Sequence, residues 1–205
     1  MRVKSMVRFK KRIMALSLFL TVAMAPSAAL AKQDVLVTYF SLDYLIPKDV
    51  DAVSSATRVE MDTAVVARKI AALAQADLVE LRSTYAYPAV SYEKTKQIVQ
   101  QYAHNQEKPL LERTDLSFSD YSTVCIGFPV WFHKAPPEIE SFVKEHVRDL
   151  QGKKVMFFTT SGSTRPDEII EGFKKLLPDV QILPTLSITM QNMDDDVKKL
   201  DNLRL

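Results

Sequence analysis

Apolar runs of strand length alternate with segments of helical period from about residue 34 to the end of the chain. The predicted strands are 35–40, 78–81, 124–128, 155–160 and 180–183, with 186–189 as a further part of the fifth. Helices are predicted where apolar residues recur at helical spacing, at 64–74, 92–106, 136–146, 169–177 and 194–203. Strands that alternate with helices form βαβ units and a parallel sheet. The pattern therefore predicts a doubly wound, five-stranded α/β sheet with helices on both faces, whose ligands bind beyond the carboxyl ends of the strands.

A different kind of segment precedes this alternation. Residues 2–12 contain six basic residues and no acidic one, and an apolar run follows from Ile13 to Met24. The small-residue pattern Ala29-Leu30-Ala31 comes next. This order is typical of a secretory signal peptide, and the apolar run is short for a membrane span. We expect residues 1–31 to be removed and residues 32–205 to form an exported domain, periplasmic or extracellular; the alternative is an uncleaved N-terminal anchor.

The excess positive charge of the chain lies in this leader. The full chain has a net charge of +2, whereas residues 32–205 retain 21 Lys and Arg against 25 Asp and Glu, a net charge of −4. An acidic mature domain gives no support for nucleic-acid binding. Cys125 is the only cysteine, which excludes an internal disulfide and predicts a small core residue. No cysteine follows the leader to carry a lipid, so we expect no stable membrane insertion after cleavage.

The segment after the first strand is a candidate phosphate site. It begins with Ser41 and stays irregular until Met61-Asp62-Thr63, where the first helix is predicted to start. Hydroxyl groups and free amides at a helix N-terminus can hold a phosphate without a lysine. Ser41 and Thr63 are the predicted ligands. The alternative is that Asp62 or Thr63 is simply a helix cap and Ser41 a turn residue.

The segment after the third strand is a candidate surface for a flat ligand. It reads Pro129-Val130-Trp131-Phe132, and Trp131 is the only tryptophan of the chain. An aromatic ring on such a loop offers a stacking surface to another flat ring. The alternative is that Trp131 covers the core from above.

Two further segments are candidates. Thr160-Ser161-Gly162, after the fourth strand, combines hydroxyls with a glycine that lets the backbone approach a ligand. The alternative has Thr164 capping the next helix, with Asp167 at its third position. After the second strand, a tyrosine of Tyr85-Ala86-Tyr87-Pro88 could reach the same edge, or the segment is a surface turn.

Several enzyme signatures are missing from the sequence. There is no G-x-G-x-x-G fingerprint, no P-loop and no G-x-S-x-G elbow. The three histidines, His104, His133 and His146, lack metal-ligand spacing. We therefore predict no catalytic acid, base, nucleophile or metal ligand.

Together these segments resemble the flavodoxin family, in particular its short bacterial members, over residues 34–205. Tyr39-Phe40-Ser41 is similar to the family's Tyr-Phe-Ser after strand one, and Gly127 to Phe132 is similar to its Gly-Tyr-Pro-Ile-Trp-Trp. Asp120 to Val124 resembles the family's lead into strand three, and Thr159 to Thr164 its hydroxyl and glycine loop. The sequence departs from the family at Met61-Asp62-Thr63, where Gly-Asn-Thr is expected, and in the long insertion before it.

The resemblance implies strand order 2-1-3-4-5 and FMN as cofactor. It implies contacts to FMN from Ser41, Thr63, Pro129, Val130, Trp131, Phe132, Thr160, Ser161 and Gly162. The implied function is redox transfer, with electrons or hydride passing to a partner or small acceptor; whether the protein is an enzyme stays open. The alternative is a flavodoxin-fold protein that has lost FMN and acts as a binding or structural module, and hydrolytic or metal-dependent chemistry is disfavoured by the missing motifs.

Overall fold

A computed structural model describes residues 34–42, 55–85, 87, 97, 100–101, 111–112, 116–189, 191, 193–203 and 205. The predicted signal peptide lies outside these residues. So does most of the predicted helix at 92–106, of which only residues 97, 100 and 101 are described, all of them helical. Among the helices that the structure describes, none combines the length and the apolar character needed to cross a membrane.

The strands form one parallel sheet. They are β1 (Val35–Phe40), β2 (Asp77–Leu81), β3 (Thr123–Pro129), β4 (Lys154–Ser161), β5 (Gln181–Ile182) and β6 (Leu186–Thr189). Their order is β2-β1-β3-β4-β5, with β6 also paired to β4. The predicted order is confirmed, and the predicted fifth strand is divided into β5 and β6. Pro184 lies between the two parts and has no N–H with which to continue the ladder.

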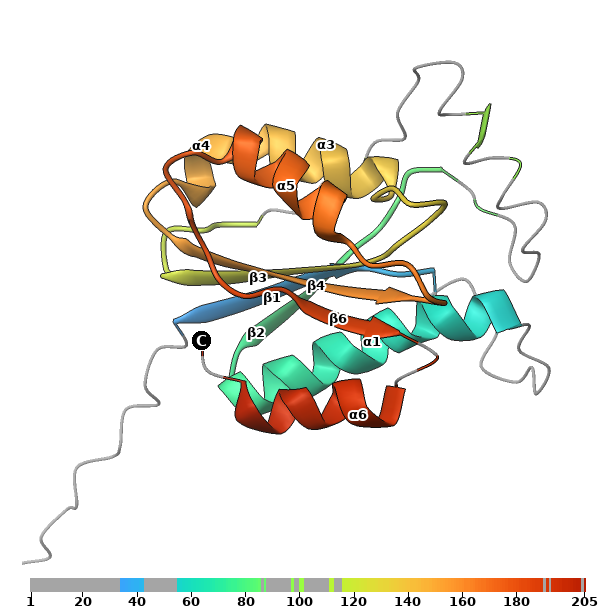
Figure 1. Cartoon of the computed structure of the whole chain (residues 1–205). Helices are drawn as coiled ribbons and strands as arrows, with labels where there is room; N and C mark the ends of the chain where they lie inside the picture. The colour runs from blue at the N-terminus through green and yellow to red at the C-terminus, as the bar shows by residue number, and fades with distance from the viewer. Residues whose placement is uncertain are drawn as a thin grey trace, which may run out of the picture. The chain divides into compact units, whose positions relative to one another are not determined.

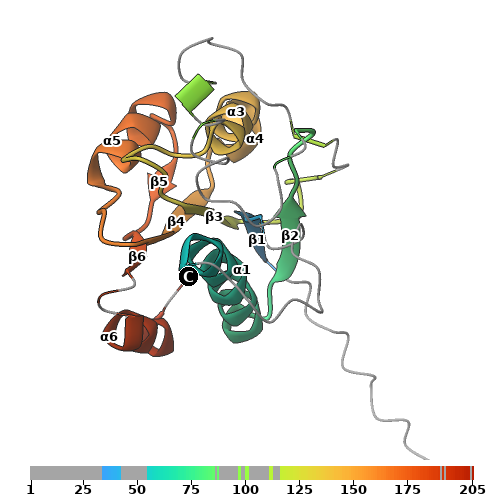
Figure 2. The same cartoon turned by 90° about the vertical axis from the view of Figure 1, so that its right-hand side faces the viewer.

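The helices cover both faces of the sheet. They are α1 (Ser55–Ala74), α3 (Pro137–Glu145), α4 (Val147–Leu150), α5 (Asp167–Leu176) and α6 (Met193–Lys198), followed by a 3₁₀ turn, η3 (Lys199–Asn202). In Figures 1 and 2, α3, α4 and α5 lie on one face, and α1 and α6 lie on the other. The predicted doubly wound architecture is confirmed.

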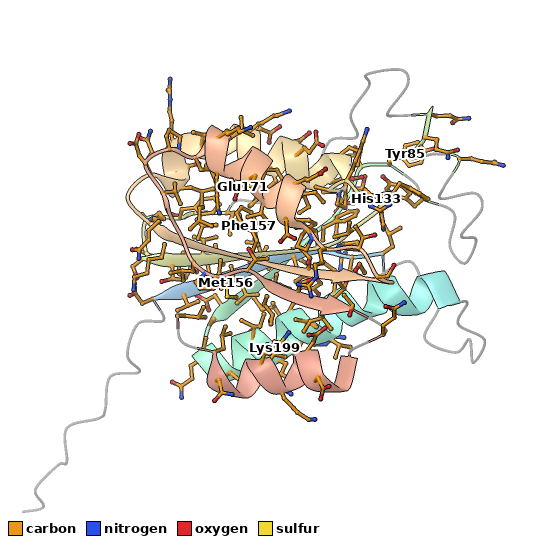
Figure 3. All side chains as sticks on the ribbon, viewed as in Figure 1. Tyr85, His133, Met156, Phe157, Glu171 and Lys199 are labelled. Atoms are coloured by element: carbon orange, nitrogen blue, oxygen red, sulfur yellow. The ribbon has the colours of Figure 1, made fainter. Side chains whose placement is uncertain are left out.

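Two apolar clusters hold these layers together. Because side chains alternate along a strand, Phe157 of β4 points toward α5 while the adjacent Met156 points toward α1 and α6 (Figure 3). Phe157 stacks on Phe173 of α5, with ring centroids 5.2 Å apart. Cys125 is fully buried in the cluster under α1, as predicted, and burial raises the pKa of its thiol to about 12.

One predicted helix start is wrong, and one helix cap that was considered as an alternative is absent. α1 begins at Ser55, so Thr63 lies well inside the helix instead of at its N-terminus. No Gly or Pro lies between Ser55 and Thr63 to interrupt the helix. Helix α5 begins at Asp167 with Pro166 as its cap residue and no side-chain cap, so Thr164 does not cap it. A proline is suited to a helix start because it has no amide hydrogen to leave unpaired.

Candidate functional site

The loops that follow β1, β3 and β4 meet at the carboxyl edge of the sheet. Strand β1 ends on Phe40, and the next two residues, Ser41 and Leu42, are both buried. The amide of Val130 donates to the carbonyl of Thr160 at 2.8 Å, which extends the pairing of β3 with β4 beyond the strand. The predicted segments are therefore brought to one edge, and hydrogen bonding joins two of them directly.

Trp131 opens a tight turn. Its amide donates to the carbonyl of Lys134 at 2.9 Å, and the amide of Lys134 donates back at 2.8 Å. The two residues between them, Phe132 and His133, have φ angles of 48° and 64°. Positive φ at both central positions is the geometry of a type I′ turn, which usually contains Asn or Gly. Two bulky residues in this conformation make it a strained turn, which we call the Trp131 turn (residues 131–134).

The indole of Trp131 is partly buried and contacts two other rings. Its centroid lies 5.7 Å from that of Phe40 at an interplanar angle of 76°, and 5.9 Å from that of Tyr87 at 63°. Both are edge contacts, and Trp131 is packed against the core cluster beneath α3 and α5. Trp131 therefore covers part of the core and also retains exposed surface at the edge of the sheet.

A buried carboxyl lies behind these rings. The hydroxyl of Tyr87 donates to Oε1 of Glu138 at 2.8 Å, and both residues are almost completely buried. Burial is the main cause that raises the pKa of Glu138, and hydrogen bonds from Ser83 and Tyr87 act in the opposite direction. This burial could not be predicted from the sequence, because Glu138 looks like an ordinary acidic residue in the first turn of a helix.

The predicted hydroxyl ligands are all buried, and two of them, Thr160 and Ser161, are the last residues of β4. Thr63 and Thr160 are hydrogen-bonded to each other through their hydroxyl oxygens, so Thr63 lies between α1 and β4. The hydroxyl of Ser161 donates to the carbonyl of Thr164 at 2.7 Å. Gly162, which follows, is exposed, and an added Cβ there would meet no atom within 4 Å. Gly162 is therefore in the open position that close approach of a ligand requires.

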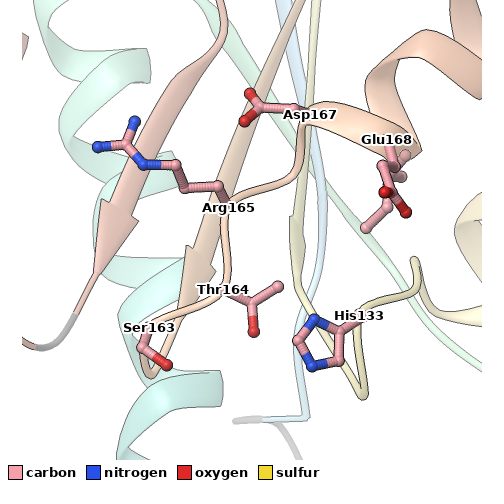
Figure 4. Close-up of a pocket in the computed structure, with 7 residues that line it drawn as sticks. His133, Ser163, Thr164, Arg165, Asp167 and Glu168 are labelled. Atoms are coloured by element: carbon pink, nitrogen blue, oxygen red, sulfur yellow. The ribbon is translucent and has the colours of Figure 1, made fainter.

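Two hollows flank the loop after β4. The first has a volume of about 520 Å³, which we call the His133 hollow, and Thr164 and His133 face each other across it (Figure 4). It is lined by His133, Ser163, Thr164, Arg165, Asp167, Glu168 and Ile169. The second, between this loop, β6 and α6, has a volume of about 560 Å³ and includes Arg165, Ser187 and Lys199 in its lining. Trp131 lines neither of the two, although the His133 hollow begins two residues further along the same turn. Figure 3 shows His133 and Tyr85 at this same end of the sheet.

The remaining predicted contacts lie around these features. Pro129 and Val130 are buried where β3 ends, and Phe132 is 39% exposed at the tip of the Trp131 turn. In the part of the chain that the structure describes, no group of His, Cys, Asp and Glu side chains could hold a metal ion.

Comparison with known proteins agrees with this geometry. A model of the flavodoxin family matches residues 48–202, about three quarters of the chain. The chain belongs to the flavodoxin family. No curated protein is similar enough to be matched.

Solved structures share the fold of this flavodoxin at low sequence identity. A protein assigned as a flavoprotein from Bacteroides eggerthii is 22% identical, with a TM-score of 0.61 over 84% of this chain and 98% of the other. A flavoprotein from Lactobacillus acidophilus, crystallised in complex with FMN, is 17% identical, with a TM-score of 0.59 over 82% of this chain and 99% of the other. These likenesses support the fold assignment independently of the sequence motifs.

Proposed function

We propose that this flavodoxin binds FMN and transfers electrons or hydride to a partner or small acceptor. The observation that carries the proposal is Trp131, held on a turn at the carboxyl edge of the sheet with part of its ring exposed. Family membership and the FMN complex of the Lactobacillus acidophilus flavoprotein support the same cofactor. When bound, FMN supplies the redox chemistry, and the protein supplies binding, orientation and electrostatics.

The residues at this edge are better suited to hold the flavin ring of FMN than to hold its phosphate. Trp131 would stack on the flavin ring, and the backbone of Thr160, Ser161 and Gly162 would hold its polar edge, because the hydroxyls of Thr160 and Ser161 are already bonded within the protein. Buried Thr159 Oγ1, in β4 beside them, has no hydrogen-bond partner among the described residues. Unused hydrogen-bonding capacity of this kind suits a polar ligand.

The phosphate would be held on the other side of the edge. Ser41 and the first turn of α1, beginning at Ser55, are the groups expected there, because free amides at a helix N-terminus favour an anion. Thr63 is a poorer candidate than the sequence suggested, since it bonds to Thr160 inside the domain. This contact is the observation that favours the alternative function, a flavodoxin-fold module that no longer binds FMN.

A titration of apo protein with FMN and with riboflavin tests both parts of the site. Stacking should quench the fluorescence of Trp131, which is the only tryptophan. Trp131→Ala should weaken FMN binding by roughly 1–3 kcal/mol, the magnitude typical of aromatic stacking. Charged hydrogen bonds to the phosphate should favour FMN over riboflavin by at least about tenfold. Protein that stays colourless and takes up no FMN would favour the binding-module alternative.

We also propose that the domain acts outside the cytoplasm. The support is the leader at residues 1–31, with its basic segment, apolar run and Ala29-Leu30-Ala31 pattern. Mass spectrometry of protein from its native source should find a chain that begins at Lys32. A chain that retains residues 1–31 in the membrane fraction would contradict export with cleavage.

A further inference from the structure

Glu138 is an unusual residue to find at the centre of this edge. It is the second residue of α3, and its side chain is fully buried. Within the described part of the chain, side-chain hydrogen bonds reach it from Tyr87 and Ser83, and its Oε2 has no partner. A buried carboxyl stabilises a fold poorly, because an apolar side chain would avoid the desolvation. Its specific contribution is directional: it fixes the position of the Tyr87 hydroxyl.

Tyr87 passes this constraint to the candidate flavin surface. It is 3% exposed, and its ring makes edge contacts with the rings of Trp131 and Tyr85. The segment that carries it pairs with Leu111 through an isolated bridge at Ser83. The amide of Tyr85 donates to the hydroxyl of Ser83 at 3.1 Å, and the amide of Tyr87 donates to the carbonyl of Tyr85 at 3.0 Å. Tyr87 therefore connects the segment after β2, the start of α3 and the Trp131 turn.

We propose that Glu138 is a positioning residue of this site: its carboxyl anchors Tyr87, and Tyr87 fixes the plane of Trp131. Glu138 itself need not touch the ligand. The inference rests on the proposed function only for its consequence, which is that a fixed indole binds the flavin ring more tightly than a mobile one. Fixing a side chain before binding removes an ordering cost from the binding step.

The test removes single groups from the network. Tyr87→Phe deletes only the hydroxyl, Glu138→Leu deletes the acceptor, and Glu138→Gln keeps an acceptor oxygen in a side chain of the same shape. Tyr121→Phe is the matched control, because its hydroxyl also bonds a carboxylate, that of Asp77 at 2.6 Å. That bond lies at the start of β2, so it is at the opposite edge of the sheet from Trp131.

Two readouts separate this inference from the proposed function. Time-resolved fluorescence anisotropy of the apo protein reports the motion of Trp131 without any flavin. Calorimetric titration reports FMN affinity. We expect Tyr87→Phe and Glu138→Leu to increase indole motion and to weaken FMN binding by about fivefold to tenfold. Glu138→Gln should stay within about twofold of the parent, and Tyr121→Phe should change neither readout.

The two readouts together show whether the positioning role or the proposed function has failed. If indole motion increases in the two variants but no protein form binds FMN, the positioning role stands and the proposed function fails. If FMN binds and both variants match the parent in motion and affinity, the positioning role is wrong. The double variant Tyr87→Phe/Glu138→Leu should bind FMN no more weakly than the more affected of the two single variants, because both substitutions remove the same hydrogen bond. Additive losses in the double variant would overturn the link between the two residues.

Discussion

Gly127 should tolerate no side chain, because a buried ring occupies the space where its Cβ would lie. A Cβ built there would be 2.0, 2.1 and 2.7 Å from three ring atoms of Phe158. Nonbonded carbons pack at about 3.5–4.0 Å, so the ring would have to move by roughly 1.5 Å. Phe158 is fully buried in the cluster under α1, so its ring can move only by displacing its neighbours. Overpacking of this kind typically costs 1–3 kcal/mol, and this severe overlap places Gly127→Ala at about 3 kcal/mol.

Denaturant unfolding and thermal melting measure this cost. For a domain of this size, about 3 kcal/mol corresponds to a fall in Tm of roughly 6–12 °C. Gly172→Ala is the matched control: Gly172 lies inside α5 with no atom within 4 Å of an added Cβ, so alanine should stabilise by up to about 1 kcal/mol. Phe158→Leu should recover part of the loss in the Gly127→Ala background. A Gly127→Ala protein within about 0.5 kcal/mol of the parent would refute the packing argument.

Three other predictions concern ionisation, reactivity and strain. Burial raises the pKa of Glu138 above its ordinary value of 4.5. Between these two pKa values the folded state holds a proton that the unfolded state has lost. The stability of the fold should therefore fall as pH rises from about 4.5 through the pKa of the folded state. Melting curves across this range should show a shallower fall for Glu138→Gln, and identical slopes would contradict a buried neutral acid. Cys125, with a pKa near 12, should react with thiol reagents only after unfolding; labelling of native protein at neutral pH would show access to the core. His133→Gly should stabilise by roughly 0.5–1 kcal/mol by relieving positive φ, whereas His133→Ala should give no such gain in denaturant unfolding.

The features of the fold that the sequence predicted are those that depend on repeated apolar positions. Strands β1, β3 and β4 are buried on both faces, and such strands appear in a sequence as unbroken apolar runs. The order of the strands came from resemblance to the flavodoxin family instead, because local patterns do not specify which strands become neighbours. The division of the last strand into β5 and β6 depends on one residue, Pro184, whose effect the apolar pattern does not show.

The candidate site was only partly predictable for a related reason. Sequence position placed Trp131 and the loop after β4 at the correct edge, because both directly follow buried strands. The predicted start of α1 was wrong. Asp62 and Thr63 are residue types that often cap a helix and so suggested an N-terminus there, whereas the helix begins at Ser55. The contact between Tyr87 and Glu138 joins residues 51 positions apart, and no local pattern marks either of them as buried.

The two halves of the site differ in how they are held in place. On the ring side, Pro129 pairs with Thr160 in the sheet, and the bond from Val130 to Thr160 carries that register into the Trp131 turn. The position of the indole is thus set by the sheet and by Phe40 and Tyr87, which come from outside the turn. On the phosphate side, the expected ligands depend on where α1 begins and on Ser41. Under the proposed function, binding energy from the ring and from the phosphate would therefore originate in separate elements. Changes at the start of α1 should alter the preference for FMN over riboflavin while leaving the environment of the flavin ring, and so its absorption spectrum, the same.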